Sequence, residues 1–206
     1  MKNVIALIAL VTVTCFAQAQ ENTDDKPKAS LFIEPGVTYQ TLDTEVDWGS
    51  AVSPSTGKNN GLGASFRLGM HIDEKFFAAI DGRYTMSKFE DSAVNTNIDA
   101  RTYDLAPLIG FQMPDIGLRI WGSYVVWGEL DPDKVTSTTI NYDAKFSKAT
   151  GYRVGAGFHV YSVSLNVEYQ DLKYGTVDVD VLPASFNPNS ATSKGVLVGV
   201  SFPIEL

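Results

Sequence analysis

The sequence predicts an all-β fold, an eight-stranded antiparallel up-and-down barrel, on three observations. Apolar residues recur at every second position in segments of roughly ten residues, which is the period of a β-strand. The pattern occurs eight times, and clusters of Gly, Pro, Asn, Asp and Ser separate the segments. The connections are alternately long and short, so tight turns gather at one end of the sheet and long loops at the other.

The N-terminal segment is predicted to lie outside the barrel. Lys2 precedes an apolar run that ends in Ala17-Gln18-Ala19, the small-x-small pattern of a signal peptidase site. The domain organisation that we expect is a secretory signal peptide at 1–19, a periplasmic lead-in at 20–29 and the barrel at 30–206.

The first four strands are each predicted from uncharged residues at alternate positions. They are Leu31 to Gln40, Leu62 to Ile72, Phe76 to Met86 and Thr102 to Met113. The tight turn Asp73-Glu74-Lys75 joins the second to the third. Pro35 and Pro107 lie inside two of these strands, and since proline cannot donate a hydrogen bond to the ladder, we expect a local bulge at each.

The last four strands follow the same rule. They are Ile116 to Glu129, Gly151 to Val160, Val163 to Gln170 and Gly195 to Leu206, with short turns at Pro114-Asp115 and Tyr161-Ser162. The predicted long loops are Thr41 to Gly61, Ser87 to Arg101, Leu130 to Thr150 and Asp171 to Lys194. In the last loop Val177, Val179 and Val181 alternate with polar residues, so we expect the sheet to continue there as a β-ribbon.

The two faces of the predicted strands differ in charge. One set of alternate positions is uncharged, as lipid would impose, because a Lys or Arg facing the bilayer midplane costs ~2–4 kcal/mol. The opposite set contains Arg but no Lys, and Arg pairs bidentately with carboxylates where water is scarce. We expect this set to form an ion-pair network in the lumen, made of Glu34, Arg67, Asp81, Arg83, Asp104, Arg119, Glu129, Arg153 and Glu168. Bulky side chains should complete the filling, namely Phe32, Phe77, Trp121 and Trp127.

Two further features favour lipid over water outside the barrel. Glycine is frequent in the charged set, as expected of a narrow lumen in which small residues face large ones. Six tyrosines fall in the uncharged set towards the long-loop end, and they predict an extracellular aromatic girdle of Tyr39, Tyr84, Tyr103, Tyr124, Tyr152 and Tyr169. Together these features predict a transmembrane β-barrel with long extracellular loops and short periplasmic turns.

The last strand carries the most specific resemblance. Uncharged residues alternate to its end at Val196, Val198, Val200, Phe202, Ile204 and Leu206. In this the chain resembles the small outer-membrane barrels of Gram-negative bacteria, of the OmpA-domain and OmpX-like kind, although members usually end in Phe. The resemblance implies a monomer in the bacterial outer membrane, in contact with outer-membrane lipid and lipopolysaccharide. It also implies recognition of the C-terminal strand by the barrel-assembly machinery.

Composition excludes several functions. The chain is acidic, with a formal net charge of −8, so a nucleic-acid partner is not expected. The only cysteine, Cys15, lies in the predicted signal, which leaves no thiol for redox or metal chemistry. His71 and His159 are on the polar set at the short-turn end, where they could approach across the lumen as a metal or pH-sensitive site. We expect them instead to be structural, and we expect no metal or other cofactor.

The function predicted from these features is non-enzymatic. We expect an outer-membrane barrel whose lumen is plugged by side chains and which serves envelope integrity or surface interaction. One alternative is a narrow passive channel for small solutes or ions, opened by rearranged Arg–carboxylate pairs. The other is a lipid A-modifying enzyme, which the position of the two histidines disfavours because they are far from the outer rim.

Overall fold

The computed structural model describes residues 29–47, 54–91, 96–136, 141–179 and 190–206, almost all of them in strands. The predicted signal peptide and nearly all of the lead-in fall outside this part and stay predictions. No helix among the described residues is long and apolar enough to cross a membrane.

The strands are long and antiparallel. Their bounds are β1 Ala29–Asp47, β2 Ser55–Ile72, β3 Phe76–Asp91, β4 Thr96–Met113, β5 Leu118–Val125, β6 Trp127–Pro132, β7 Val135–Thr136, β8 Asn141–Tyr142, β9 Ala144–Val160, β10 Val163–Val179, β11 Ser190–Ser201 and β12 Ile204–Glu205. A short 3₁₀ turn, η1 Pro114–Ile116, connects β4 to β5.

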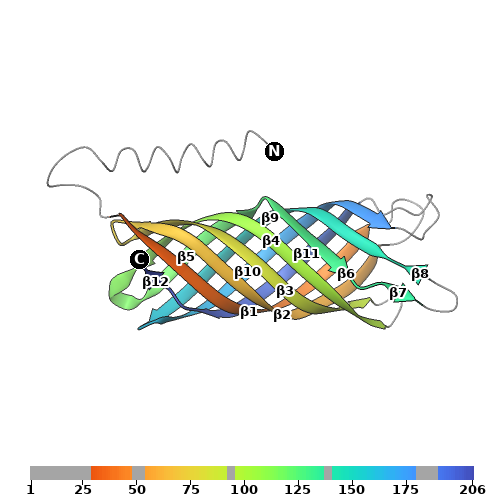
Figure 1. Cartoon of the computed structure of the whole chain (residues 1–206), viewed down its shortest axis with the longest axis horizontal. Helices are drawn as coiled ribbons and strands as arrows, with labels where there is room; N and C mark the ends of the chain where they lie inside the picture. Colours follow the sequence, from red (N-terminus) through yellow and green to blue (C-terminus); the bar gives the residue numbers. More distant parts are fainter. Residues whose placement is uncertain (1–28, 48–53, 92–95, 137–140, 180–189) are drawn as a thin grey trace.

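The sheet closes into a ring of eight strands, which confirms the predicted fold class. Each strand pairs with its neighbour in the order β1, β2, β3, β4, β5, β9, β10, β11, and β11 pairs with β1. β6 continues β5 between β4 and β9, whereas β12 continues β11 along β1. Figure 1 shows the cylinder from the side, with the C-terminus and the start of β1 at one end and the β7–β8 hairpin beyond the other.

The strands extend well past the predicted segments at the long-loop end. β1 runs to Asp47 rather than Gln40, and β9 begins at Ala144 rather than Gly151. The predicted loops are therefore wrong over much of their length, because the walls of the barrel continue there as paired strands. The one such continuation that the sequence predicts is the ribbon in the fourth loop: β10 extends to Val179, and Val181 lies outside the described residues.

The two prolines have different effects on the ladder. Opposite Pro107, Val126 is an extra residue between β5 and β6, so pairing with β4 shifts by one residue, as a bulge does. Opposite Pro35, the break between β11 and β12 leaves the register unchanged, and the Phe202 amide still donates to the Pro35 carbonyl. The expected bulge at Pro35 is therefore wrong, since Pro203 interrupts the pairing without adding a residue.

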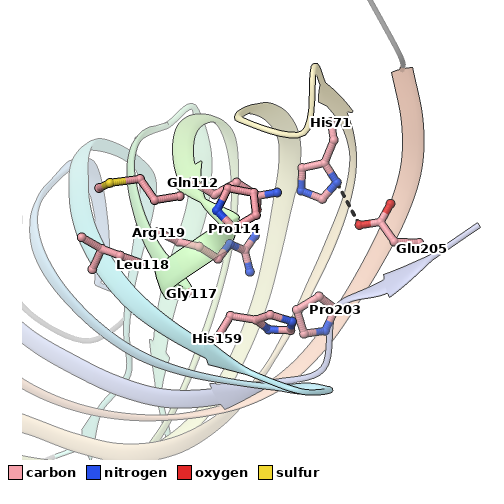
Figure 2. Close-up of a pocket in the computed structure, with 10 residues that line it drawn as sticks. His71, Gln112, Pro114, Gly117, Leu118, Arg119, His159, Pro203 and Glu205 are labelled. Atoms are coloured by element: carbon pink, nitrogen blue, oxygen red, sulfur yellow. Dashed lines mark ion pairs between the residues drawn. The ribbon is translucent and has the colours of Figure 1, made fainter.

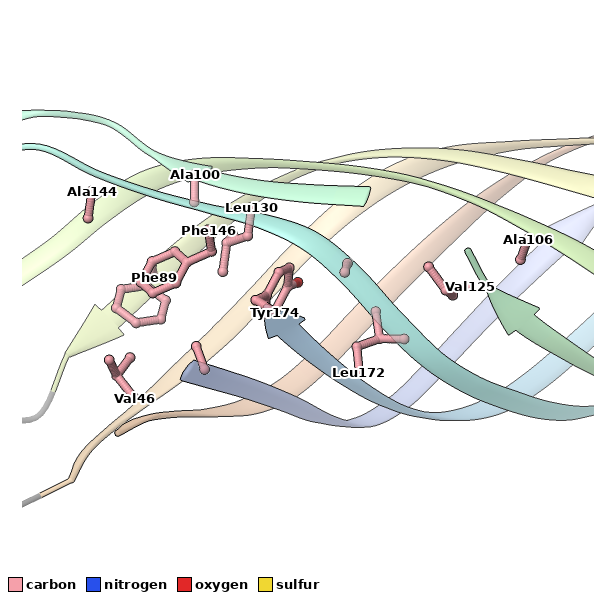
Figure 3. Packing of buried hydrophobic residues seen from close by; sticks show 12 residues of the cluster. Val46, Phe89, Ala100, Ala106, Val125, Leu130, Ala144, Phe146, Leu172 and Tyr174 are labelled. Atoms are coloured by element: carbon pink, nitrogen blue, oxygen red, sulfur yellow. The ribbon is translucent and has the colours of Figure 1, made fainter. Parts of the chain in front are cut away.

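Side chains fill the described interior in three layers. The layer farthest from the short turns is mainly apolar, and Figure 3 shows its side chains packed between the strands. Its members are Val46, Phe89, Ala100, Ala106, Val125, Leu130, Ala144, Phe146, Ala149, Leu172, Tyr174 and Ala191. A layer of charged side chains follows, and an aromatic layer of Phe32, Phe77 and Trp121 with Ala79 and Leu108 lies beneath it.

The outer wall is apolar between two aromatic bands. Side chains such as Ile109, 72% exposed, and Leu62, 60% exposed, point away from the interior. A water-soluble protein rarely exposes so large a continuous apolar surface, whereas a lipid-facing wall requires one. Phe76 and Phe111 contact each other edge to face near the short turns.

Candidate functional site

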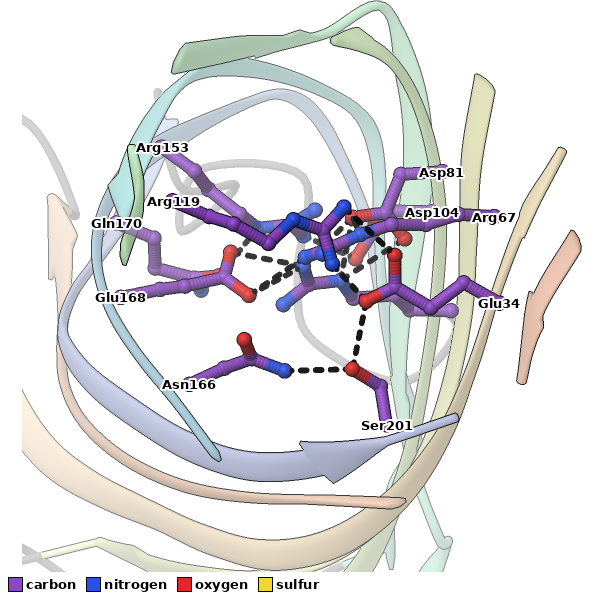
Figure 4. A network of polar contacts seen from close by, with 11 residues as sticks. Glu34, Arg67, Asp81, Asp104, Arg119, Arg153, Asn166, Glu168, Gln170 and Ser201 are labelled. Atoms are coloured by element: carbon purple, nitrogen blue, oxygen red, sulfur yellow. Dashed lines mark hydrogen bonds and ion pairs between the residues drawn. The ribbon is translucent and has the colours of Figure 1, made fainter. Parts of the chain in front are cut away.

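The candidate site is the charged layer in the middle of the lumen, drawn in Figure 4. Every wall of the barrel contributes a polar side chain to it, because inward-facing positions of all eight strands meet on the axis. The structure brings together eight of the nine predicted network residues, each less than a tenth exposed: Glu34, Arg67, Asp81, Arg83, Asp104, Arg119, Arg153 and Glu168.

Arg67 and Arg83 form the centre of the layer. Arg67 donates to Glu168 Oε1 at 3.0 Å and to Asp81 Oδ2 at 3.3 Å. Arg83 donates to the same two carboxylates, at 2.8 Å and 2.6 Å. Two guanidiniums and two carboxylates thus share their hydrogen bonds, which links β2, β3 and β10 across the lumen.

Glu34 links this centre to the short-turn end. It accepts from Arg67 Nη1 at 3.2 Å and from Arg119 Nη2 at 3.0 Å. The Ser201 hydroxyl donates to Glu34 at 2.6 Å and accepts from Asn166 at 2.8 Å. Each carboxylate oxygen of Glu34 therefore has a charged partner despite its burial.

Arg153 forms a separate pair at the long-loop side of the layer. It donates to Asp104 Oδ2 at 2.5 Å and to the amide oxygen of Gln170 at 3.0 Å. Four arginines and four carboxylates then balance the charge of the layer, so these side chains hold no net charge to attract an ion.

Glu129 and Trp127 do not belong to the lumen, and their predicted placement is wrong. The extra residue Val126 reverses the alternation, so Trp127 faces outward and is 48% exposed. Glu129 lies on the same outer face, where Tyr103 donates to it and Lys145 Nζ lies 2.6 Å from its carboxylate. A one-residue bulge moves every following side chain to the opposite face.

Aromatic rings of the lower layer pack against two arginines of the network. The Arg67 guanidinium lies over the Trp121 ring at 4.7 Å, and the Arg119 guanidinium over the Phe77 ring at 4.8 Å, both within cation–π range. Glycines make room for these rings, since a Cβ on Gly110 would approach Phe77 to 2.2 Å. This is the pairing of small with large residues that a narrow lumen requires.

A pocket of about 230 Å³ opens at the short-turn mouth and holds both histidines, as Figure 2 shows. His71 Nδ1 is 3.0 Å from Glu205 Oε1, whereas His159 Nδ1 is 3.0 Å from Ser164 Oγ. The two rings thus have separate partners. The described residues contain no group of three His, Cys, Asp or Glu that could hold a metal ion.

Sequence reasoning missed the neutral partners of the network. Ser164 hydrogen-bonds to His159, Gln170 to Arg153 and Ser201 to Glu34, whereas Asn166 donates to the Ser201 hydroxyl. Ser164, Asn166 and Gln170 are at alternate positions of β10 with Glu168 and so point inward with it, and this alternation would have identified them as lumen residues. Without the register, however, polar uncharged residues cannot be assigned to particular charged partners.

The tyrosines predicted as a girdle lie on the outer wall. Tyr84 faces Tyr103 across β3 and β4, and Tyr124 faces Tyr152 across β5 and β9. Most of them are about half exposed, and Tyr169 is 41% exposed. Amphipathic rings at one level are typical of the boundary between hydrocarbon and water.

Beyond the tyrosines the ionisable groups have neighbours that shift their pKa values. The hydrogen bond to Glu129 raises the pKa of Lys145, and the hydrogen bond to Asp171 raises the pKa of Lys194. Burial raises the pKa of the Tyr174 hydroxyl, which belongs to the apolar layer. Both lysines therefore remain charged at neutral pH.

Comparison with known proteins agrees with this architecture. The family described as outer membrane protein beta-barrel domain matches residues 6–202. No curated protein matches the sequence. Among solved structures, neisserial surface protein A is 15% identical with a TM-score of 0.52, over 85% of this chain and 98% of that one. The attachment invasion locus protein Ail of Yersinia pestis is 12% identical with a TM-score of 0.48, over 87% and 100% of the two chains. The outer membrane protease OmpT from Escherichia coli is 10% identical with a TM-score of 0.37, over 89% and 99%. At such identities the likeness shows the fold alone.

Proposed function

Since the chain belongs to the outer membrane protein beta-barrel domain family and lies in the bacterial outer membrane, we propose that it is a non-enzymatic barrel with a plugged lumen. Its role in this proposal is envelope integrity or surface interaction, exerted through the outer wall and the long-loop end. Its expected partners are outer-membrane lipid and lipopolysaccharide, with the barrel-assembly machinery acting on the C-terminal strand.

The observation that carries the proposal is the succession of layers across the lumen. A permeating ion would have to pass an apolar layer, a neutral layer of paired charges and an aromatic layer. Moving one charged side chain aside leaves its partner buried and unpaired, at a cost of about 3–5 kcal/mol. Such an opening would be rare without a ligand to stabilise it.

Conductance tests the plug directly. We expect the refolded chain to give no single-channel openings above background in planar bilayers, with a known porin inserted in parallel as a positive control. Mobility in SDS that changes on boiling would verify that the recorded protein is a closed barrel. Discrete openings that disappear or change in size in Glu168→Gln would instead support the narrow channel.

Among the described residues, the serine that hydrogen-bonds directly to a histidine is not accessible. Ser164 is the serine within hydrogen-bonding distance of His159, and it is fully buried between β9 and β10. A nucleophile must reach the substrate as well as its base. We expect the lipid A of cells with and without this protein to have identical mass spectra, and a mass difference would contradict the non-enzymatic proposal.

A further inference from the structure

Lysines gather on one side of the outer wall beyond the tyrosine girdle. Lys148 and Lys173 lie on the neighbouring strands β9 and β10, both are exposed, and their flanking residues Ala149, Leu172 and Tyr174 point into the interior. The two lysine side chains therefore point away from the barrel axis.

The two lysines lie at equal distances along their strands beyond two girdle tyrosines. Lys148 lies four residues beyond Tyr152 on β9, and Lys173 lies four residues beyond Tyr169 on β10. Four residues span about 13 Å along the strand, and because the strands are tilted, the height of the lysines above the tyrosines is smaller than this. The lysines are thus placed just outside the hydrocarbon boundary that the tyrosines mark, at the depth of lipid headgroups.

The pair lacks acidic partners in the part of the chain that the structure describes. Lys194 on β11 continues the row but lies 3.3 Å from Asp171, and on the opposite wall Lys88 lies 2.6 Å from Asp99. No described carboxylate pairs with Lys148 or Lys173. Like charges on adjacent strands repel each other, so a bound anion would stabilise this arrangement.

The backbone at Lys148 is irregular in a way that exposes its side chain. Its φ is +58°, in the left-handed region that only a few per cent of non-glycine residues adopt. The regular pairing of β9 with β10 is interrupted between Ala149 and Ser147, opposite Gly175. A strained residue of this kind is a pointer to function when a site adjoins it.

An apolar groove descends from the girdle on the adjoining wall. It is lined by Pro107, Ile109, Gly122, Tyr124 and Val154. Gly122 leaves the wall open, since a Cβ there would have its nearest neighbour 4.0 Å away. The groove begins at Tyr152, the girdle residue four positions along β9 from Lys148, and runs from there towards the hydrocarbon level.

We propose that this wall binds one lipopolysaccharide molecule, with Lys148 and Lys173 contacting its phosphate groups and an acyl chain lying in the groove. The site deepens the lipid partnership of the proposed function and rests on it. Charge complementarity selects a phosphorylated lipid, and the groove beneath selects one with acyl chains at the level of the outer leaflet.

The test uses native mass spectrometry of the refolded, detergent-solubilised chain titrated with lipopolysaccharide. We expect one retained molecule on the parent chain, and binding weaker by at least about tenfold in K148Q/K173Q. The matched control K58Q/K88Q removes two lysines from the outer wall of β2 and β3 and should bind like the parent. K148R/K173R keeps the charge and should also bind like the parent.

Two competitors identify the lipid. Dephosphorylated lipopolysaccharide should displace the bound molecule poorly, and so should phosphatidylglycerol. The phosphate site would be overturned if K148Q/K173Q bound lipopolysaccharide as tightly as the parent, or if dephosphorylated lipopolysaccharide bound as tightly as the phosphorylated form. The assignment to a glycolipid would be overturned if phosphatidylglycerol were retained as well as lipopolysaccharide. Heat-modifiable mobility verifies the fold of each variant. These results are independent of conductance, which alone tests the plug.

Discussion

Glu168 is the residue on which the central charged layer depends most. Its carboxylate accepts from both Arg67 and Arg83 while only 4% of the residue is exposed. In Glu168→Gln both guanidiniums stay buried but lose an anionic partner, so we expect the free energy of unfolding to fall by about 3–5 kcal/mol. Urea unfolding in detergent micelles, followed by heat-modifiable mobility, measures this.

Glu129→Gln is the matched control for that prediction. Glu129 faces outward and pairs with Lys145, whose side chain is 43% exposed, so the same chemical change should cost less than about 1 kcal/mol. Similar losses in the two variants would show that Glu129 lies in the lumen after all, and that the bulge at Val126 is misplaced.

Glycine has opposite roles on the two faces of the wall. A Cβ at Gly110 would lie 2.2 Å from the Phe77 ring and 2.8 Å from the Ile120 carbonyl oxygen. We expect Gly110→Ala to lower the free energy of unfolding by about 1–3 kcal/mol through overpacking. Gly122→Ala, on the open lipid-facing wall, should leave stability unchanged or raise it by up to about 1 kcal/mol. A tolerated Gly110→Ala would mean that the aromatic layer is loosely packed.

The strands show how much of the fold the sequence could predict. Alternation with apolar residues outward identified all eight strands, because lipid excludes charge over the whole height of the hydrocarbon. Above the girdle the same strands enter water, and the alternation reverses: Tyr39 points outward, whereas Leu42 and Val46 point inward. A reversal of phase resembles the end of a strand, so the sequence pattern predicts loops where the structure has these extensions. The extensions could have been recognised from apolar residues that continue to alternate with polar ones, but on the opposite set of positions.

Phe146 tests whether the extensions fold with the barrel. It lies in the apolar layer above the girdle, 1% exposed, with its ring 6.1 Å from that of Tyr174. If the extensions belong to one cooperative unit, Phe146→Ala should lower the free energy of unfolding by about 3–5 kcal/mol. Lys145→Ala, one residue away on the exposed face, should cost less than about 1 kcal/mol. No loss in Phe146→Ala would indicate that the extensions open independently of the barrel.

At the scale of the molecule, charge and periodicity predicted which residues share the lumen but not how they pair. Arg67 could have met any of several carboxylates at a similar height. Its partners depend on the stagger of the strands, which places Glu34, Arg67 and Asp81 side by side on β1, β2 and β3. That stagger is a property of ring closure, and a single sequence gives no direct measure of it. The shift at Val126 is equally local, so Glu129 could not be separated from the network by alternation alone.

Ring closure itself can be tested with a cross-link, because the only cysteine lies in the predicted signal peptide. Thr44 and Ser193 are register partners on β1 and β11, both buried, with their hydroxyl oxygens 3.3 Å apart. Adjacent antiparallel strands bring Cα atoms within the distance that a disulfide spans. In the oxidised T44C/S193C variant we expect an intramolecular disulfide that changes the mobility of the boiled chain. Closing so long a loop should also raise the free energy of unfolding by roughly 4–5 kcal/mol.

T44C/T85C, which places the two cysteines on strands that are not neighbours, should stay reduced. In an open sheet β1 and β11 would be opposite edges, so a T44C/S193C chain that does not cross-link would show that the cylinder is not closed.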